Sequence, residues 1–231
     1  MSQSDTPVLT LDGPGGAGKG TLASALAAEL GWFLLDSGAL YRLVGLIALR
    51  EGLNPDEPDD CDIARERARR LDLHFMPDTG AGQRVLLAGE DVTDLIRTDA
   101  ISDAASKWAV QPAIRSALLE RQRDFAVAPG LIADGRDMGT VIFPDAGLKI
   151  YVTASAEERA QRRFDQLSAT GVDASLSRIY REILDRDARD ASRAVAPLKP
   201  AADAHVIDTT GETVAASLER VRGLVREKGW L

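Results

Sequence analysis

The residues best suited to chemistry lie near the N-terminus, in a short segment that is rich in glycine and contains a lysine. Glycine has no Cβ, so such a segment can coil tightly and turn its backbone N–H groups toward one point. That point suits a polyphosphate, and the lysine would extend its charge over the β- and γ-phosphates. Thr21 would bring a hydroxyl to the phosphate or to Mg²⁺. The segment predicts a nucleotide phosphate site made of Gly13, Pro14, Gly15, Gly16, Ala17, Gly18, Lys19, Gly20 and Thr21.

The sequence on either side of this segment supports the prediction. Residues 8–11 form an apolar run typical of a strand, and Leu22, Leu26 and Leu30 have helical spacing. A strand, a glycine loop and a helix in this order form the setting in which the pattern G-x-x-x-x-G-K binds phosphate. Gly20 stands where serine or threonine usually follows the lysine, which we interpret as a variant of the pattern. The alternative is a glycine-rich turn that only joins a strand to a helix.

Composition narrows the class of protein. A length of 231 residues fits one substantial domain, and the net charge of -8 argues against a general nucleic-acid binder, which needs a basic face. A single cysteine, Cys61, excludes an intramolecular disulfide and a cysteine-built metal site. No leader-like or membrane-spanning apolar run is apparent, so we expect a cytoplasmic protein without a membrane partner. Only five of the 28 cations are lysines, and arginine suits bidentate contacts with phosphate.

The chain alternates between short apolar runs and segments with helical spacing. This alternation predicts an α/β fold with a five-stranded parallel sheet and helices on both faces. Polar residues follow two of the predicted strands, at Asp36–Gly38 and at Asp134–Asp137, where α/β proteins bind ligands. Arg42 lies in the first turns of the next helix and could reach into such a crevice. The predicted strands are 8–11, a buried strand at 33–35, 131–133, 148–152 and 205–208.

Between the second predicted helix and the later sheet strands, the sequence pattern changes. An acidic linker broken by prolines, at 54–62, is followed by a short arginine-rich helix. Two runs that alternate apolar and polar residues come next, at 71–75 and 84–87, with a turn at 77–82 between them. Residues 90–93 are a possible third strand, so we predict a small β insertion. His74 alternates with apolar neighbours and should face solvent. Further helices are expected at 99–110, from Pro112 to about Ala126, and from a capping box at Ser155 and Glu158 to about Ser168.

Charge is densest between Arg159 and Arg193. Spacing alone favours a solvated helix face, with pairs between Asp185 and Arg189 and between Arg186 and Asp190. Such exposed pairs contribute only a few tenths of a kcal/mol each.

A phosphate loop alone shows only that a nucleotide phosphate is bound, but four segments together are more specific. The chain has neither an Asn-Lys-x-Asp guanine-reading motif nor a Leu-Ser-Gly-Gly-Gln transporter signature. The four segments are residues 13–21, Leu35–Arg42, Ala133–Thr140 and Arg193–Leu198. With these segments, and over nearly its whole length, the chain resembles the bacterial cytidylate kinases, within the P-loop nucleoside monophosphate kinases. Gly15-Gly16 departs from the Ser-Gly that is common in that family.

The resemblance implies an enzyme that transfers the γ-phosphoryl group of ATP to CMP, with dCMP as a further substrate. It implies one P-loop kinase domain over 1–231, in which 54–98 is a monophosphate-binding insertion and about 158–193 a helical lid. Lys19 and the loop glycines would hold ATP, with Mg²⁺ as cofactor. The resemblance therefore favours interpreting the arginine-rich stretch as lid and substrate-binding residues rather than as a solvated helix face. The implied roles are Arg42, Arg136 and Arg193 on the acceptor phosphate, Ser37, Ser106, Arg115 and Asp137 on cytosine, Arg186 and Asp190 on ribose, and Arg162 and Arg163 in the lid over ATP.

The chemistry fits a site without a dedicated base, because the acceptor phosphate is already anionic near pH 7. The protein must instead align two repelling phosphates, neutralise charge and exclude water. We expect a monomer that binds ATP and CMP. Two alternatives remain: a kinase of another nucleotide or of a small hydroxyl metabolite, and a nucleotide-dependent switch or binding protein without enzymatic activity.

Overall fold

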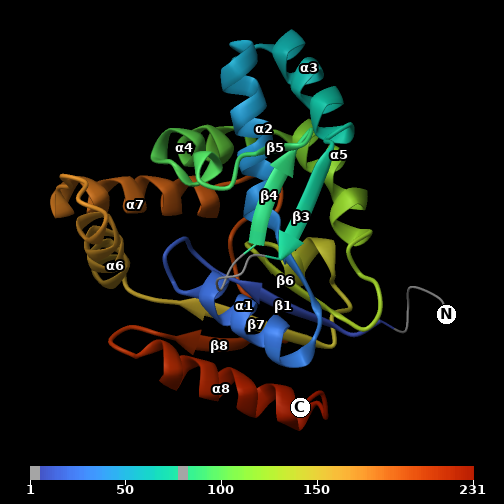
Figure 1. The fold of residues 1–231 in the computed structure, drawn as a ribbon, viewed down its shortest axis with the longest axis vertical. Coiled ribbons are helices and arrows are strands. Elements are labelled where there is room, and N and C mark those ends of the chain that lie inside the picture. The colour runs from blue at the N-terminus through green and yellow to red at the C-terminus, as the bar shows by residue number, and fades with distance from the viewer. Residues whose placement is uncertain (1–5, 78–82) are drawn as a thin grey trace. The chain divides into compact units, whose positions relative to one another are not determined.

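The computed structural model describes residues 6–77 and 83–231 and divides the chain into two compact units. The first unit joins the chain up to Leu34 with Val127–Leu231, and the second is Leu35–Ala126. Figure 1 labels most of the helices and strands of both units. The predicted insertion at 54–98 lies inside the second unit.

The first unit is built on a five-stranded sheet in the order β2-β6-β1-β7-β8. The central strand β1 pairs in parallel with β6 and β7, and β7 pairs in parallel with β8. This confirms the predicted fold class. The strands are β1 (Val8–Asp12), β2 (Phe33–Asp36), β6 (Leu131–Gly135), β7 (Leu148–Thr153) and β8 (His205–Asp208).

One face of this sheet packs against helices α1 (Lys19–Leu30) and α8 (Val214–Glu227). Leu9 and Leu11 of β1 belong to this core, together with apolar side chains of both helices. Alternate side chains of a strand point to opposite faces, so Thr10 and Asp12 point away from α1 and α8. A single π-helical turn, η3 (Met138–Ile142), lies against β1, and the sequence did not predict it.

The helical pair that was predicted as a lid forms two adjacent helices, α6 (Ala156–Ala169) and α7 (Leu176–Ala191) (Figure 1). The Ser155 side chain caps α6 by accepting a hydrogen bond from the backbone N–H of Glu158, at 3.2 Å. The Glu158 carboxylate binds Arg162 at 2.9 Å. The helix therefore begins where the capping signal predicted.

The second unit combines helices with a small antiparallel sheet in the order β3-β4-β5. Helix α2 packs against α4 so closely that a Cβ on Gly45 would lie 2.8 Å from the backbone nitrogen of Ala105. The elements are α2 (Ser37–Glu51), α3 (Pro58–Arg69), β3 (Leu73–Pro77), β4 (Gln83–Leu87), β5 (Glu90–Asp91), a 3-10 turn (Leu95–Arg97), α4 (Asp99–Trp108) and α5 (Pro112–Arg123).

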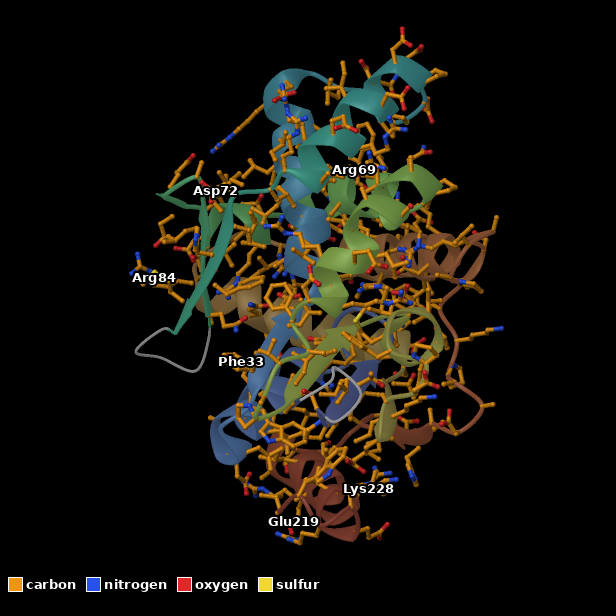
Figure 2. All side chains as sticks on the ribbon, turned by 90° about the vertical axis from the view of Figure 1, so that its right-hand side faces the viewer. Phe33, Arg69, Asp72, Arg84, Glu219 and Lys228 are labelled. Carbon is orange, nitrogen blue, oxygen red and sulfur yellow. The ribbon has the colours of Figure 1, made fainter. Side chains whose placement is uncertain are left out.

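Several expectations need correction. Strand β2 is an edge strand, and Phe33 is 49% exposed at the surface (Figure 2), so the predicted burial of 33–35 is wrong at its first residue. The linker predicted at 54–62 is shorter, because α3 already begins at Pro58, where proline fits the first helical turn. Helix α5 ends at Arg123 rather than near Ala126.

Other features outside the site can be compared with the expectations from sequence. His74 is exposed, as the alternation predicted. Most of the turn predicted at 77–82 lies outside the described residues. Within the described part of the chain, no helix has the length and apolar character needed to cross a membrane.

Candidate active site

The glycine loop between β1 and α1 has the close packing that its composition predicted. A Cβ on Gly13 would lie 1.9 Å from the carbonyl oxygen of Val152, so no side chain fits there. Gly16 and Gly18 have φ angles of +83° and +92°, which residues with a side chain rarely adopt. Gly15 has neither constraint, and a Cβ there would lie 3.3 Å from the guanidinium of Arg136. The loop is therefore held by backbone contacts at Gly13 and by conformation at Gly16 and Gly18.

Lys19 begins helix α1 and is buried, with 7% of its surface exposed. Its Nζ donates to the carbonyl oxygen of Pro14 at 2.9 Å and lies 3.9 Å from a carboxylate oxygen of Asp134. Burial lowers its pKa to about 8, although Asp134 acts in the opposite direction. The ammonium thus lies against the loop, where phosphate oxygens would strengthen its charged form.

Asp134 is a site residue that the sequence reading did not single out. It lies at the carboxyl end of β6, and its Oδ2 is 3.5 Å from the position of a Cβ on Gly20, in the first turn of α1. Thr21 follows and is exposed. A hydroxyl and a carboxylate are the hard oxygen donors that Mg²⁺ takes together with phosphates and water. Oxygen donors of the kind that Mg²⁺ takes are therefore present in Thr21, in the first turn of α1, and in Asp134, beside that turn.

A buried carboxylate gathers two of the predicted acceptor arginines. Asp190 is fully buried, and its two oxygens accept from Nε of Arg136 and from Nη2 of Arg193. Burial raises the pKa of Asp190, but the charges of Arg136, Arg193 and Arg186 outweigh it and hold the pKa below its ordinary value of 3.8. Spacing alone would pair Asp190 with Arg186, and only the fold reveals a partner 54 residues away. The predicted contact of Asp190 with ribose stays a prediction.

Arg136 and Arg186 also lie at the phosphate loop. The nearest guanidinium nitrogens of these two arginines are 3.3 Å and 3.8 Å from the position of a Cβ on Gly15. The first unit therefore places Arg136, predicted for the acceptor phosphate, and Arg186, predicted for the ribose, beside the loop that would hold ATP. Asp137 follows Arg136 directly and is buried, at 3% exposure.

The predicted lid arginines differ in their surroundings. Arg162 donates to the carbonyl oxygen of Thr209 at 2.6 Å and lies 3.9 Å from the position of a Cβ on Gly18, so it borders the loop. Arg163 donates to Gln166 on its own helix, at 3.0 Å. Arg159, which was not predicted, donates to the carbonyl oxygen of Gly15 at 3.2 Å and to both oxygens of Asp187 on α7. No spacing signal distinguishes Arg159 from its arginine neighbours.

The second unit carries Ser37 and Arg42 at the start of α2. The Asp36 side chain accepts from the backbone N–H of Ala39, which caps the helix, and from Arg42 at 2.5 Å. A Cβ on Gly38 would lie 2.9 Å from the Arg42 guanidinium, so glycine leaves room for it. Asp36 is thus a further residue that orients a predicted site arginine, and its role depends on side-chain contact rather than on sequence pattern.

Ser106 and Arg115 are both buried in the same unit. The Ser106 side chain is 3% exposed, and its hydroxyl has no hydrogen-bond partner within the part of the chain that the structure describes. The Arg115 guanidinium lies 5.7 Å from the centre of the Tyr41 ring and donates to the carbonyl oxygen of Ala109. A buried hydroxyl without a partner is costly, and a ligand's polar group could satisfy it.

The chain is similar to known proteins over nearly its whole length. A family model described as cytidylate kinase matches residues 9–227. The chain is 52% identical over 225 residues to a cytidylate kinase of Pseudomonas aeruginosa (strain LESB58), with 97% of each chain covered. It is 51% identical over 228 residues to that of Shewanella loihica, with 99% of this chain and 97% of the relative covered.

Proposed function

Because this chain belongs to the cytidylate kinase family, we propose that it transfers the γ-phosphoryl group of ATP to CMP, and also to dCMP. The products are CDP or dCDP and ADP, in pyrimidine nucleotide metabolism. The observation that carries the proposal is the gathering of Arg136, Arg186 and Arg193 around Asp190, beside the phosphate loop. Such a cluster next to an ATP loop suits a second phosphate.

In this proposal the loop N–H groups and Lys19 bind the β- and γ-phosphates of ATP. Arg42, Arg136 and Arg193 bind the phosphate of CMP. An oxygen of that phosphate forms a bond to the γ-phosphorus as the bond from phosphorus to the ADP oxygen breaks. No proton has to be removed from the attacking oxygen, so no general base is required. Mg²⁺, held by Thr21 and Asp134, would neutralise charge on the transferred group.

The base would be recognised by Ser37, Ser106, Arg115 and Asp137. Cytosine offers a donor at N4 and acceptors at N3 and O2. The unpartnered hydroxyl of Ser106 and the carboxylate of Asp137 can accept from N4, whereas the Arg115 guanidinium can donate to N3 or O2. Arg186 and Asp190 are proposed to contact the ribose.

Water must be excluded, because otherwise ATP is hydrolysed. Helix α6 carries both Arg162 and Arg163, and we propose that α6 and α7 close over ATP. The position of Arg162 beside Gly18 supports its part in the proposal. Cytoplasmic location and a monomeric state stay predictions.

A panel of acceptors with Mg-ATP tests the function. ADP release is measured with CMP, dCMP, UMP, AMP, GMP and small hydroxyl metabolites, with Lys19→Met as the inactive control. We expect CMP to give the highest kcat/KM. Preference for another acceptor would support the alternative kinase, and nucleotide binding without acceptor-dependent ADP release would support a switch or binding protein.

A further inference from the structure

Asp12 is a buried carboxylate that the reaction described above does not use. It is the last residue of β1 and is 3% exposed. Its Oδ1 accepts from the backbone N–H of Met138 at 2.7 Å, and its Oδ2 accepts from the backbone N–H of Gly139 at 2.8 Å. Both distances are those of good N–H···O bonds. The carboxylate thus binds the backbone of one turn with both oxygens.

This turn continues directly from the acceptor residues. Asp12 is paired in register with Gly135, the last residue of β6, and Arg136 and Asp137 are the only residues between that pair and the two N–H groups. The short segment that carries Arg136 and Asp137, both predicted to bind the acceptor, is therefore fixed at both ends. The β ladder holds one end, and the Asp12 carboxylate holds the other.

Packing fixes the same turn from a second side. A Cβ on Gly139 would lie 2.8 Å from the Thr10 hydroxyl and 3.2 Å from the side chain of Lys149. Gly139 therefore sits directly on β1 and β7, with no room for a side chain. Because hydrogen bonds and close packing both act on Gly139, loss of the Asp12 hydrogen bonds or a side chain at position 139 should move the turn.

The carboxylate weakens the fold at neutral pH. Burial raises the pKa of Asp12 to about 7, although the two backbone hydrogen bonds act in the opposite direction, and the charge of Asp137 raises it further while that of Lys19 lowers it. The pKa in the folded chain is above the ordinary value, so stability falls as the pH rises through about 7. A buried group that costs stability is expected more often at functional sites than in a purely structural role.

We propose that Asp12 is a positioning residue for the acceptor: by holding the N–H groups of Met138 and Gly139, it sets the place of Arg136 and Asp137 beside the phosphate loop. Asp12 acts through the turn and does not touch either substrate. The inference rests on the proposed function, because it concerns how the CMP phosphate is bound.

The test compares Asp12→Asn with Thr10→Val. Asparagine has the same shape but offers one acceptor and one donor, so one N–H of the turn loses its partner. We expect the KM for CMP to rise about tenfold, the equivalent of one lost hydrogen bond. The dissociation constant of a non-hydrolysable ATP analogue should change less than about twofold. Amide hydrogen exchange at Met138 and Gly139 should become faster. Thr10 lies on the same face of β1, and its hydroxyl has no hydrogen-bond partner within the described residues. Valine has nearly the same size and leaves both Asp12 hydrogen bonds in place, so Thr10→Val should leave all three measurements unchanged.

Several results would overturn the proposal. An unchanged KM for CMP in a folded Asp12→Asn protein would leave Asp12 with a structural role only. Equal weakening of CMP binding and of ATP-analogue binding would mean that Asp12 acts on the phosphate loop. Unchanged amide hydrogen exchange at Met138 and Gly139 would mean that Asp12 does not hold the turn. If Asp12→Asn does not fold, Gly139→Ala displaces the turn from the Thr10 side, and it must show the same selective loss of CMP. A wild type that does not phosphorylate CMP refutes the proposed function instead, and the exchange measurement still tests the anchor.

Discussion

Replacing Asp190 with asparagine should remove the charge that holds Arg136 and Arg193 together. The carboxylate is fully buried, and the two arginine side chains are only 15% and 5% exposed, so water screens these pairs little. A hydrogen bond to a charged group contributes about 1.5–3 kcal/mol, and breaking a buried ion pair costs about 3–5 kcal/mol. Asparagine keeps one acceptor, so we expect the free energy of unfolding to fall by about 3 kcal/mol at pH 7.

The stability lost in Asp190→Asn should depend on pH in a definite direction. Because the arginines hold the pKa of Asp190 below 3.8, its contribution is fully present above the unfolded value and is lost as the pH falls through the folded value. The stability difference between wild type and Asp190→Asn should therefore be constant from pH 7 to about pH 5 and become smaller below about pH 4. Urea unfolding at several pH values measures it. The kcat/KM for CMP at pH 7 should fall about a hundredfold, because both arginines lose their anchor.

Glu90→Gln is the matched control, since it neutralises a carboxylate that binds Arg50 with both oxygens but is exposed. It should change stability much less than Asp190→Asn and leave CMP use unaltered. The reasoning is refuted if the two variants lose the same stability, or if the Asp190→Asn difference persists unchanged into acid.

Three further predictions concern single site residues. Lys19→Met should fold normally but lose roughly a thousandfold or more in kcat, measured by ADP release, and a near-normal kcat would exclude its catalytic role. Arg193→Ala should reduce kcat/KM for CMP by orders of magnitude while calorimetry shows near-normal binding of an ATP analogue; a large loss of ATP affinity would assign this arginine to ATP. Asp137→Asn should shrink the ratio of kcat/KM for CMP to that for UMP, because each reversed hydrogen bond costs about 1–3 kcal/mol. An unchanged ratio would mean that Asp137 only orients Arg136 and does not distinguish cytosine from uracil.

The sequence predicted the parts of the site that depend on local conformation. The phosphate loop could be read from its glycines because Gly16 and Gly18 need left-handed backbone angles, and the cap at Ser155 could be read because it joins residues three apart. The five strands followed from apolar runs. Such features depend on the conformation and hydrogen bonds of residues that are close in sequence, so a local sequence pattern is enough to predict them.

The missed residues depend on contacts between distant segments. Asp12 binds amides 126 and 127 residues away, and Arg159 binds a loop carbonyl 144 residues away. Their positions follow from strand order and helix packing, which no local spacing encodes. The π-helical turn was missed for a related reason: its five residues are too few for a periodic signal, and its place depends on Asp12 and on the close approach of Gly139 to β1.

The two phosphate sites of the proposed reaction share one support in the first unit. Asp12 ends the strand from which the phosphate loop departs at Gly13. Its carboxylate binds the turn that follows the neighbouring parallel strand β6, just after Arg136. Neighbouring strands lie about 4.8 Å apart, and their ladder resists sliding. In-line transfer requires the reacting atoms to approach to about 3–3.5 Å, so small shifts of either loop should slow it. By this argument the sheet itself would set the spacing of the donor and acceptor phosphates in the proposed reaction.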